Sequence, residues 1–298
     1  MVDIAFITVN YNTLNYVRDL AAFFLALDAP FTFSFTVVDN ASSDGSQEFL
    51  SSGPGPHYLQ AGENSGYGRA INRAVAATAS KYVCVTNTDV RLNRHALVAL
   101  WTFLEKHADA GVCAPRVTYE DGRDQGMVFK PSLLAHYVNW FAKLLARRSK
   151  LQVAHARGPL AVDGVMGAFF LLRRAVIPSP SLFDEDFFFF YEDTALAHTL
   201  KNRGVKCFVL PGVSIIHVGG QSRSASSVVL FYKGKYLYLK KFYGPMHAKC
   251  IYWLDRARIS YKFAVYSILA RLSSSARVSA KQRHYAYARN SHPFAALT

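Results

Sequence analysis

Short apolar runs alternate with amphipathic segments from the first residues to about Pro115. The apolar runs are short enough to favour strands, at residues 3–9, 33–39, 57–60, 81–86 and 111–115. The segments between them have helical spacing, at residues 14–27, a short stretch that ends near Ser51, 66–79 and 93–107. This alternation predicts an α/β fold with a mostly parallel central sheet and helices on both faces.

Beyond Pro115 the pattern is less regular. It predicts a hairpin tip at 120–122, a helix at 131–150, a strand at 165–172, a helix at 192–203 and strands at 205–209 and 213–217. Two basic amphipathic helices, at about 226–242 and 247–272, are expected on either side of Gly244 and Pro245. We therefore expect a main domain at residues 1–222 and a basic helical region at residues 223–298.

The composition is typical of a folded protein from a reducing compartment. Hydrophobic residues make up 51% of the chain and charged residues 18%, which excludes a mostly disordered protein. The 4 cysteines form no CxxC motif, so a disulfide scaffold and a thiolate zinc site are both disfavoured. We expect no signal peptide, because the chain opens with a strand-like run, and no spanning helix, because no apolar stretch of about 18 residues occurs.

The net charge of +14 is concentrated near the end of the sequence. Residues 221–298 hold 14 of the 34 Lys and Arg but only one acid, Asp255, whereas the other 20 basic residues are balanced by 19 acids. Such a basic, aromatic-rich region is typical of a surface for anionic lipid, nucleic acid or an acidic partner. The alternative is a helical cap that packs on the main domain and leaves its basic groups in water.

Polar side chains follow four of the predicted strands at the point where each strand ends. They are Asn10 to Asn12, Asp39 and Asn40, Asn64 to Arg69, and Asn87 to Asp89. Ligands bind beyond the carboxyl ends of the strands in open α/β sheets. The sequence therefore predicts a binding site at this edge of the sheet.

Two further features could carry chemistry. Asp89 directly follows a buried strand, where its carboxylate could bind Mg²⁺ or Mn²⁺ or simply cap a helix. His217 ends a later strand and becomes a candidate ligand if it faces Asp89. Residues 183–193 place five acids around four consecutive phenylalanines, and Glu192 and Asp193 open a helix. This pair either caps the helix or supplies a general base whose pKa is raised by apolar surroundings.

Seven segments together carry a resemblance to a known family. They are residues 7–12, 37–46, 63–72, 87–90, 163–174, 183–193 and 217–222. In this order they resemble glycosyltransferase family 2, which has the GT-A fold, and especially its bacterial rhamnosyltransferase-like branch. The resemblance covers roughly residues 3–222 and implies a GT-A nucleotide-sugar-binding domain, followed by the basic helical region.

The resemblance also implies roles for individual residues. The base and ribose of the nucleotide would be held by Thr8, Asn10, Tyr11 and Asp39, and its pocket lined by Asn64, Tyr67, Arg69 and Asn72. Asn87 and Asp89 would form the DxD-type motif, with Asn87 in place of the first acid. Asp89 and His217 would bind the Mg²⁺ or Mn²⁺ ion. Asp193 would be the catalytic base with Glu192 beside it, and the sugar and acceptor pocket would be shaped by Asp163, Gly167 and Ala168.

The implied activity is inverting transfer of a sugar from a nucleoside diphosphate sugar to a saccharide acceptor. The branch favours dTDP-rhamnose as donor, with UDP-hexose or UDP-N-acetylhexosamine as the alternative. A lipid-linked acceptor for a surface polysaccharide such as O-antigen is expected, with the enzyme peripheral on the cytoplasmic face of the cell membrane. Two rival hypotheses are a nucleic-acid-binding protein that uses the basic region, and a nucleotidyltransferase that releases pyrophosphate.

Overall fold

The computed structural model describes residues 1–52, 55–126, 132–138, 153–154, 156–219, 225–272 and 275–290. The chain forms two compact units. The sheet unit comprises Met1–Pro131, Lys143–Phe188 and Glu192–Gly219. The helical unit comprises Ser132–Ala142, Phe189–Tyr191 and Gly220–Thr298. Each unit is described below by itself.

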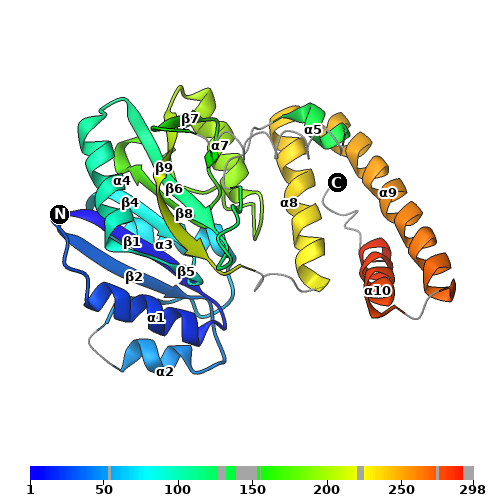
Figure 1. Ribbon diagram of the computed structural model, residues 1–298, viewed down its shortest axis with the longest axis horizontal. Coiled ribbons are helices and arrows are strands. Elements are labelled where there is room, and N and C mark those ends of the chain that lie inside the picture. Colours follow the sequence, from blue (N-terminus) through cyan, green and yellow to red (C-terminus); the bar gives the residue numbers. More distant parts are fainter. Residues whose placement is uncertain are drawn as a thin grey trace. The chain divides into compact units, whose positions relative to one another are not determined.

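One mixed sheet organises the sheet unit (Figure 1). Its strands are β1 (Val2–Asn10), β2 (Phe33–Asp39), β3 (His57–Gln60), β4 (Ser80–Thr86), β5 (Val90–Arg91), β6 (Ala110–Thr118), β7 (Leu160–Val162), β8 (Phe169–Arg173) and β9 (Lys206–His217). The strand order is β3-β2-β1-β4-β8-β6-β9-β5, and β7 pairs with β9.

The sheet is mostly parallel, as the sequence predicts. β1 pairs in parallel with β2 and β4, and β2 with β3. β8 runs antiparallel to both β4 and β6, so β6 has the direction of β4, and β9 is parallel to β6. Only β5, β7 and β8 run in the opposite direction among the described strands. The carboxyl ends of β1, β2, β3 and β4 therefore meet at one edge.

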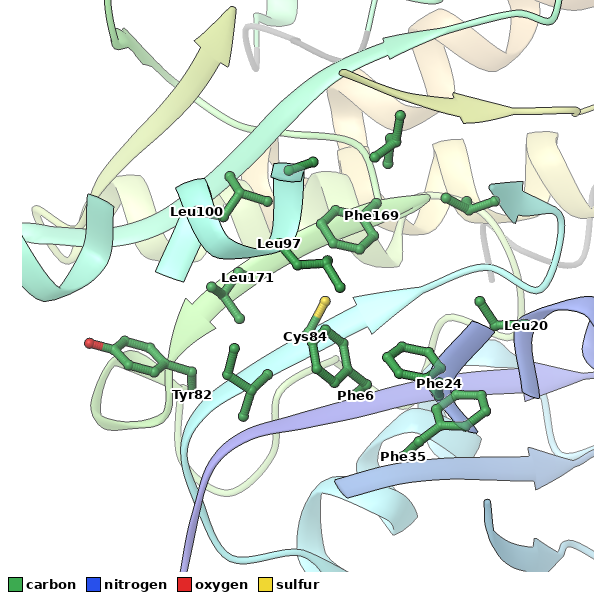
Figure 2. Packing of buried hydrophobic residues seen from close by; sticks show 14 of the residues in the cluster. Phe6, Leu20, Phe24, Phe35, Tyr82, Cys84, Leu97, Leu100, Phe169 and Leu171 are labelled. Carbon is green, nitrogen blue, oxygen red and sulfur yellow. The ribbon is translucent and has the colours of Figure 1, made fainter. Parts of the chain in front are cut away.

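Helices cover both faces of the sheet because successive strand residues point to opposite sides. Their bounds are α1 (Leu14–Leu25), α2 (Ser46–Ser51), α3 (Tyr67–Ala77), α4 (Arg94–Lys106) and α7 (Glu192–Asn202), with a 3₁₀ turn at Arg174–Val176. Phe6 of β1 packs with the apolar side of α1 and α4, whereas its neighbour Ile7 packs with α3 and α7. Figure 2 shows the first cluster, in which Phe6, Phe24 and Phe35 pack together.

The helical unit contains α5 (Leu133–Tyr137), α8 (Ala225–Tyr243), α9 (Pro245–Leu272) and α10 (Ala276–Asn290). Three tyrosines, Tyr236, Tyr238 and Tyr252, are fully buried in it, together with the ion pair between Lys235 and Asp255. Among the described residues, no helix is long and apolar enough to cross a bilayer.

The structure corrects several predicted boundaries. The strand expected at 165–172 begins only at Phe169, and the two strands expected at 205–209 and 213–217 are one strand, β9. The pairing of β9 with β6 shifts register between Leu210 and Ser214, which accommodates Pro211 and Gly212 without ending the strand. Most of the helix expected at 131–150 lies outside the described residues, and within residues 132–138 the structure shows the short helix α5.

Candidate functional site

A buried polar cluster joins the ends of β1 and β2. The Asn10 side-chain amide donates to Asp39 Oδ1 at 2.7 Å and to Ser42 Oγ at 2.9 Å. Ser42 in turn donates to Asp39 through its hydroxyl (2.5 Å, to Oδ1) and its backbone N–H (2.9 Å, to Oδ2). Since a carboxylate oxygen can accept two hydrogen bonds, Asp39 Oδ2 retains capacity for one donor from a ligand.

The same cluster extends to the end of β4. The Thr13 hydroxyl donates to Asn10 Oδ1 at 2.6 Å and lies 3.0 Å from the hydroxyl of Thr88. Thr88 directly precedes Asp89, and both are buried. A chain of hydrogen bonds therefore connects Asp39 to the residue beside Asp89.

The loops after β2 and β3 are also joined. The Asn40 amide donates to the carbonyl of Gly66 at 3.1 Å and to Asn64 Oδ1 at 3.4 Å. Gly66 has a φ of +89°, and a Cβ there would lie 2.5 Å from the Phe188 carbonyl oxygen. Only glycine fits this position. The close approach lets the Tyr67 N–H donate to that carbonyl at 2.8 Å.

Tyr67, at the start of α3, lies where the predicted site residues converge. Its hydroxyl is 3.1 Å from Asn87 Oδ1 and 3.3 Å from the Gly167 carbonyl. The pKa of this hydroxyl is well above its ordinary value, first because it is buried and then because the charges of Glu192, Asp193 and Asp89 disfavour a phenolate. Carboxyl groups from two distant parts of the sequence therefore influence the same tyrosine.

Asp89 and His217 contact each other directly, so His217 is a candidate ligand beside Asp89. Asp89 Oδ1 lies 3.2 Å from His217 Nε2, and Asp89 Oδ2 accepts from the Gly219 N–H at 3.1 Å. The short pairing of β5 with β9 places Val90 opposite His217 and so fixes this contact. Neither side chain is exposed, at 10% and 14% of full accessibility.

The hydrogen bonds of Gln125 assign the tautomer of His217. The Gln125 amide donates to the His217 carbonyl, which leaves Gln125 Oε1 to accept from His217 Nδ1 at 2.7 Å. Nδ1 therefore carries a hydrogen, and Nε2 is the ring nitrogen that faces Asp89. Histidine ligands are commonly held in this way by a hydrogen bond at the other ring nitrogen.

The donor set fits a divalent cation that has few protein ligands. No group of three or more His, Cys, Asp or Glu side chains suited to a metal was found in the part of the chain that the structure describes. Asp89 and His217 could supply two ligands, with phosphate oxygens and water completing the shell. The metal role of both residues stays a prediction.

Glu192 and Asp193 are the first two residues of α7, and their hydrogen bonds and pKa shifts differ. Asp193 accepts from the backbone N–H of Gly167 at 2.9 Å and of Thr194 at 2.6 Å. Burial raises the pKa of Asp193, and these hydrogen bonds oppose the rise. Burial, with the charge of Asp193, raises the pKa of Glu192 to about 8. At neutral pH Glu192 is therefore mostly protonated.

The remaining predicted residues occupy different surroundings. Asn72 is buried, exchanges two hydrogen bonds with the backbone of Phe183 and donates to Glu185, and Arg69 lies 3.8 Å from that glutamate. Asp163 pairs with Lys201 near the far end of α7 from Asp193.

Three more predicted residues lie on or beside the strands. Ala168 is tied to the site through its carbonyl, which accepts from the Asn87 N–H. Thr8 is fully buried and its Oγ1 has no hydrogen-bond partner within the described residues, whereas Tyr11 is half exposed. The individual roles of all these residues stay predictions.

Several residues that shape the site were not singled out from the sequence. Ser42 and Gly219 lie inside the quoted segments but were given no role, and Thr13 and Gln125 lie outside them. Ser42 could have been found as the second residue after Asn40 in a turn-forming stretch. Gln125 gives no sequence signal, because its partner His217 is 92 positions away.

Comparison with known families and proteins agrees with this arrangement. The profile described as Glycosyl transferase family 2 matches residues 5–177. A similar relative is the N-acetylglucosaminyl-diphospho-decaprenol L-rhamnosyltransferase of Mycobacterium tuberculosis (strain H37Rv), which is 25% identical over 266 residues. That alignment covers 82% of this chain and 86% of the relative.

Solved structures show the same fold at low sequence identity. The mannosyltransferase PcManGT from Pyrobaculum calidifontis, in complex with GDP-Man and Mn²⁺, has a TM-score of 0.56 and 13% identity, over 98% of this chain and 86% of that one. S. aureus TarS 1-349 in complex with UDP has a TM-score of 0.51 and 16% identity, over 97% and 87%. The GT-A fold is confirmed by these likenesses.

Proposed function

Because this chain belongs to glycosyl transferase family 2, we propose that it transfers rhamnose from dTDP-rhamnose, with inversion at the anomeric carbon, to a lipid-linked saccharide. The product would be an intermediate of a bacterial surface polysaccharide. The name of the mycobacterial relative, a rhamnosyltransferase with a decaprenol-linked N-acetylglucosaminyl acceptor, supports this choice of donor and acceptor. A UDP-hexose or UDP-N-acetylhexosamine donor is the alternative.

The polar cluster at the ends of β1 and β2 is the proposed nucleoside site. Asp39 Oδ2 would accept from a base N–H or a ribose hydroxyl, since its other hydrogen bonds are fixed by Asn10 and Ser42. Tyr11, half exposed beside this cluster, would cover the base. Asn64 and Tyr67 would line the pocket toward the diphosphate.

Asp89 and His217 would hold a Mg²⁺ or Mn²⁺ ion. When bound, such an ion supplies positive charge that stabilises the leaving diphosphate. Gln125 orients the imidazole and the Gly219 N–H orients the carboxylate, so both ligands are positioned by their own hydrogen bonds. Metal dependence is part of the proposal.

Asp193 is the proposed general base. It would take the proton of the acceptor hydroxyl while that oxygen forms a bond to the anomeric carbon and the bond to the diphosphate breaks on the opposite face. The Gly167 N–H fixes the orientation of the carboxylate, and a Cβ at Gly167 would approach Asp193 Cβ to 3.3 Å. The protonated Glu192 would keep a second negative charge away from the base.

The observation that carries the proposal is a set of contacts: the Tyr67 hydroxyl contacts Asn87 and Gly167, the Gly167 N–H donates to Asp193, and His217 contacts Asp89. The proposed metal ligands and the proposed base would therefore act side by side at the ends of the strands. A lipid-linked acceptor would also place the enzyme at the cytoplasmic face of the membrane.

A donor screen tests the function. The purified chain is incubated with N-acetylglucosaminyl-diphospho-polyprenol, Mn²⁺, and either dTDP-rhamnose, UDP-glucose or UDP-N-acetylglucosamine. We expect a rhamnosylated lipid and dTDP from the first donor alone. Transfer from a UDP-sugar alone would show that the donor is a UDP-sugar and not dTDP-rhamnose. Release of pyrophosphate from a nucleoside triphosphate, without sugar transfer, would favour the nucleotidyltransferase hypothesis.

A further inference from the structure

The helix α9 is apolar on two opposite sides. Its inner side includes Ile251, Tyr252 and Ile259, which are buried in the helical unit. Its outer side carries a row of exposed apolar residues spaced by three or four positions, which places them on one face of a helix. This row, the outer stripe, consists of Met246, Cys250, Trp253, Ala257, Tyr261, Ala264, Ile268 and Leu272.

The exposure of the outer stripe is high along its whole length. Met246 is 76% exposed, Tyr261 71%, Ile268 58% and Leu272 78%. A helix of 28 residues is about 42 Å long, and the outer stripe extends over nearly all of this length. Scattered exposed apolar residues are ordinary, but a continuous apolar surface of this length indicates an interaction site.

Basic residues follow one edge of the outer stripe. Lys249, Arg256 and Arg271 each come three positions after a stripe residue, and all three are exposed. The Arg256 guanidinium lies 5.8 Å from the ring centre of Trp253, so its charge is held beside the apolar surface. The one acid of α9, Asp255, is buried and paired with Lys235. The exposed charges of α9 are therefore all positive.

We propose that the outer stripe of α9 docks on an anionic phospholipid bilayer, with the helix lying in the plane of the membrane surface. The stripe would enter the acyl boundary while the basic edge contacts lipid phosphates, as in amphipathic helices at interfaces. The inner side of α9 packs within the helical unit, so the helix presents one side to lipid and lies along the bilayer.

The charges favour lipid over two other occupants. A second copy of this chain would bring another positive edge toward the first, with no exposed acid of α9 to pair with it. A polynucleotide would need its phosphates opposite basic groups, yet the centre of this face is apolar. An anionic bilayer satisfies both the apolar centre and the positive edge.

This inference rests on the proposed function for its biological reason, because a lipid-linked acceptor lies at a membrane surface. It can nevertheless be tested separately. Binding to vesicles does not require turnover, and turnover with a short-chain, water-soluble analogue of the acceptor does not require vesicles. If the protein turns over the soluble acceptor but does not bind vesicles, the membrane proposal has failed. If it binds vesicles but does not turn over the acceptor, the proposed function has failed.

Vesicle flotation of the full chain is the experiment. Vesicles of equimolar phosphatidylglycerol and phosphatidylcholine are compared with phosphatidylcholine alone, using the wild-type protein and the double variant Ile268→Asp/Leu272→Asp. The matched control is Leu25→Asp, since Leu25 of α1 is 66% exposed and lies in the sheet unit. Circular dichroism verifies that each variant is folded, and the soluble-acceptor assay verifies activity.

We expect the wild type and the Leu25→Asp variant to float with anionic vesicles. The double variant should bind roughly tenfold more weakly or not at all, with soluble-acceptor turnover unchanged. Equal binding by the double variant, or no vesicle binding by the wild type, would overturn the proposal. So would a dimer, or a complex with single-stranded DNA, that the double variant abolishes while vesicle binding persists.

Discussion

Buried charge has different partners at the edge of the sheet and in the helical unit. Asp255 contacts Lys235 Nζ at 2.5 Å, the Tyr236 hydroxyl at 3.3 Å and the Arg258 guanidinium at 3.4 Å. Glu192 is buried to the same degree, yet its Oε2 has no hydrogen-bond partner among the described residues. The first carboxylate stabilises the helical unit, whereas the second is kept available beside Asp193 at the candidate site.

The pKa shifts express the same contrast. In the helical unit, burial lowers the pKa of Lys235, and the attraction of Asp255 opposes this. In the sheet unit, burial and the neighbouring Asp193 both raise the pKa of Glu192. Opposite charges are paired in one region, whereas two acidic side chains are adjacent in the other. Burial alone therefore does not identify a functional carboxylate, and the groups that face it must be considered as well.

The largest effect on activity is expected for Asp193→Asn. Removal of the general base should lower kcat by about 10²–10⁴-fold. The free energy of unfolding should fall by about 1–3 kcal/mol at most, because the amide NH2 would face one of the two backbone N–H donors, that of Gly167 or that of Thr194. Steady-state transfer assays and denaturant titrations measure both quantities. Near-normal kcat in a folded variant would remove Asp193 from this role.

The opposite outcome is expected for Asp255→Asn in the helical unit. Lys235 would remain buried without a counter-charge, so the free energy of unfolding should fall by about 3–5 kcal/mol. The control is the double variant Lys235→Met/Asp255→Asn. Its free energy of unfolding should fall by less than the sum of the losses in the two single variants. If the losses in free energy of unfolding are additive, Lys235 and Asp255 do not stabilise each other. The proposed difference between the two regions would then be wrong.

A smaller, pH-dependent effect is expected for Glu192→Gln. The pKa of Glu192 rises on folding from 4.5 to about 8, so its protonated form is favoured in the folded state. Its contribution to stability is therefore full below pH 4.5 and is lost as the pH rises toward 8. Urea titrations should show the variant equal to the wild type at low pH and more stable by up to a few kcal/mol above pH 8. If the free energy of unfolding differed between variant and wild type by the same amount at every pH, the raised pKa of Glu192 would be contradicted.

The smallest effect is expected for Tyr67→Phe. Its hydroxyl has a high pKa and acts as a hydrogen-bond donor toward Asn87 or Gly167. Loss of this bond should cost about 0.5–1.5 kcal/mol of stability and lower kcat by less than about tenfold. Thermal unfolding and transfer assays test this. A loss of kcat as large as that of Asp193→Asn would place the hydroxyl in the chemistry.

The sequence predicts the main domain's strands and helices well where its pattern is long. β1, β2 and β4 are mainly apolar runs followed by polar residues, so both the strands and the polar edge can be predicted directly. β5 and β7 have two and three residues, too few for any periodicity, and were missed. The contact of Asp89 with His217 depends on β5, so the sequence could suggest this pair but could not establish it.

Calorimetry can show whether the edge of the sheet binds a nucleotide sugar together with a cation. dTDP-rhamnose is titrated into the wild type and into Asp89→Asn, each with and without Mn²⁺. We predict tight binding by the wild type that weakens strongly when Mn²⁺ is withheld, and weak, Mn²⁺-independent binding by the variant. Equal affinity in all four titrations would contradict the proposed site.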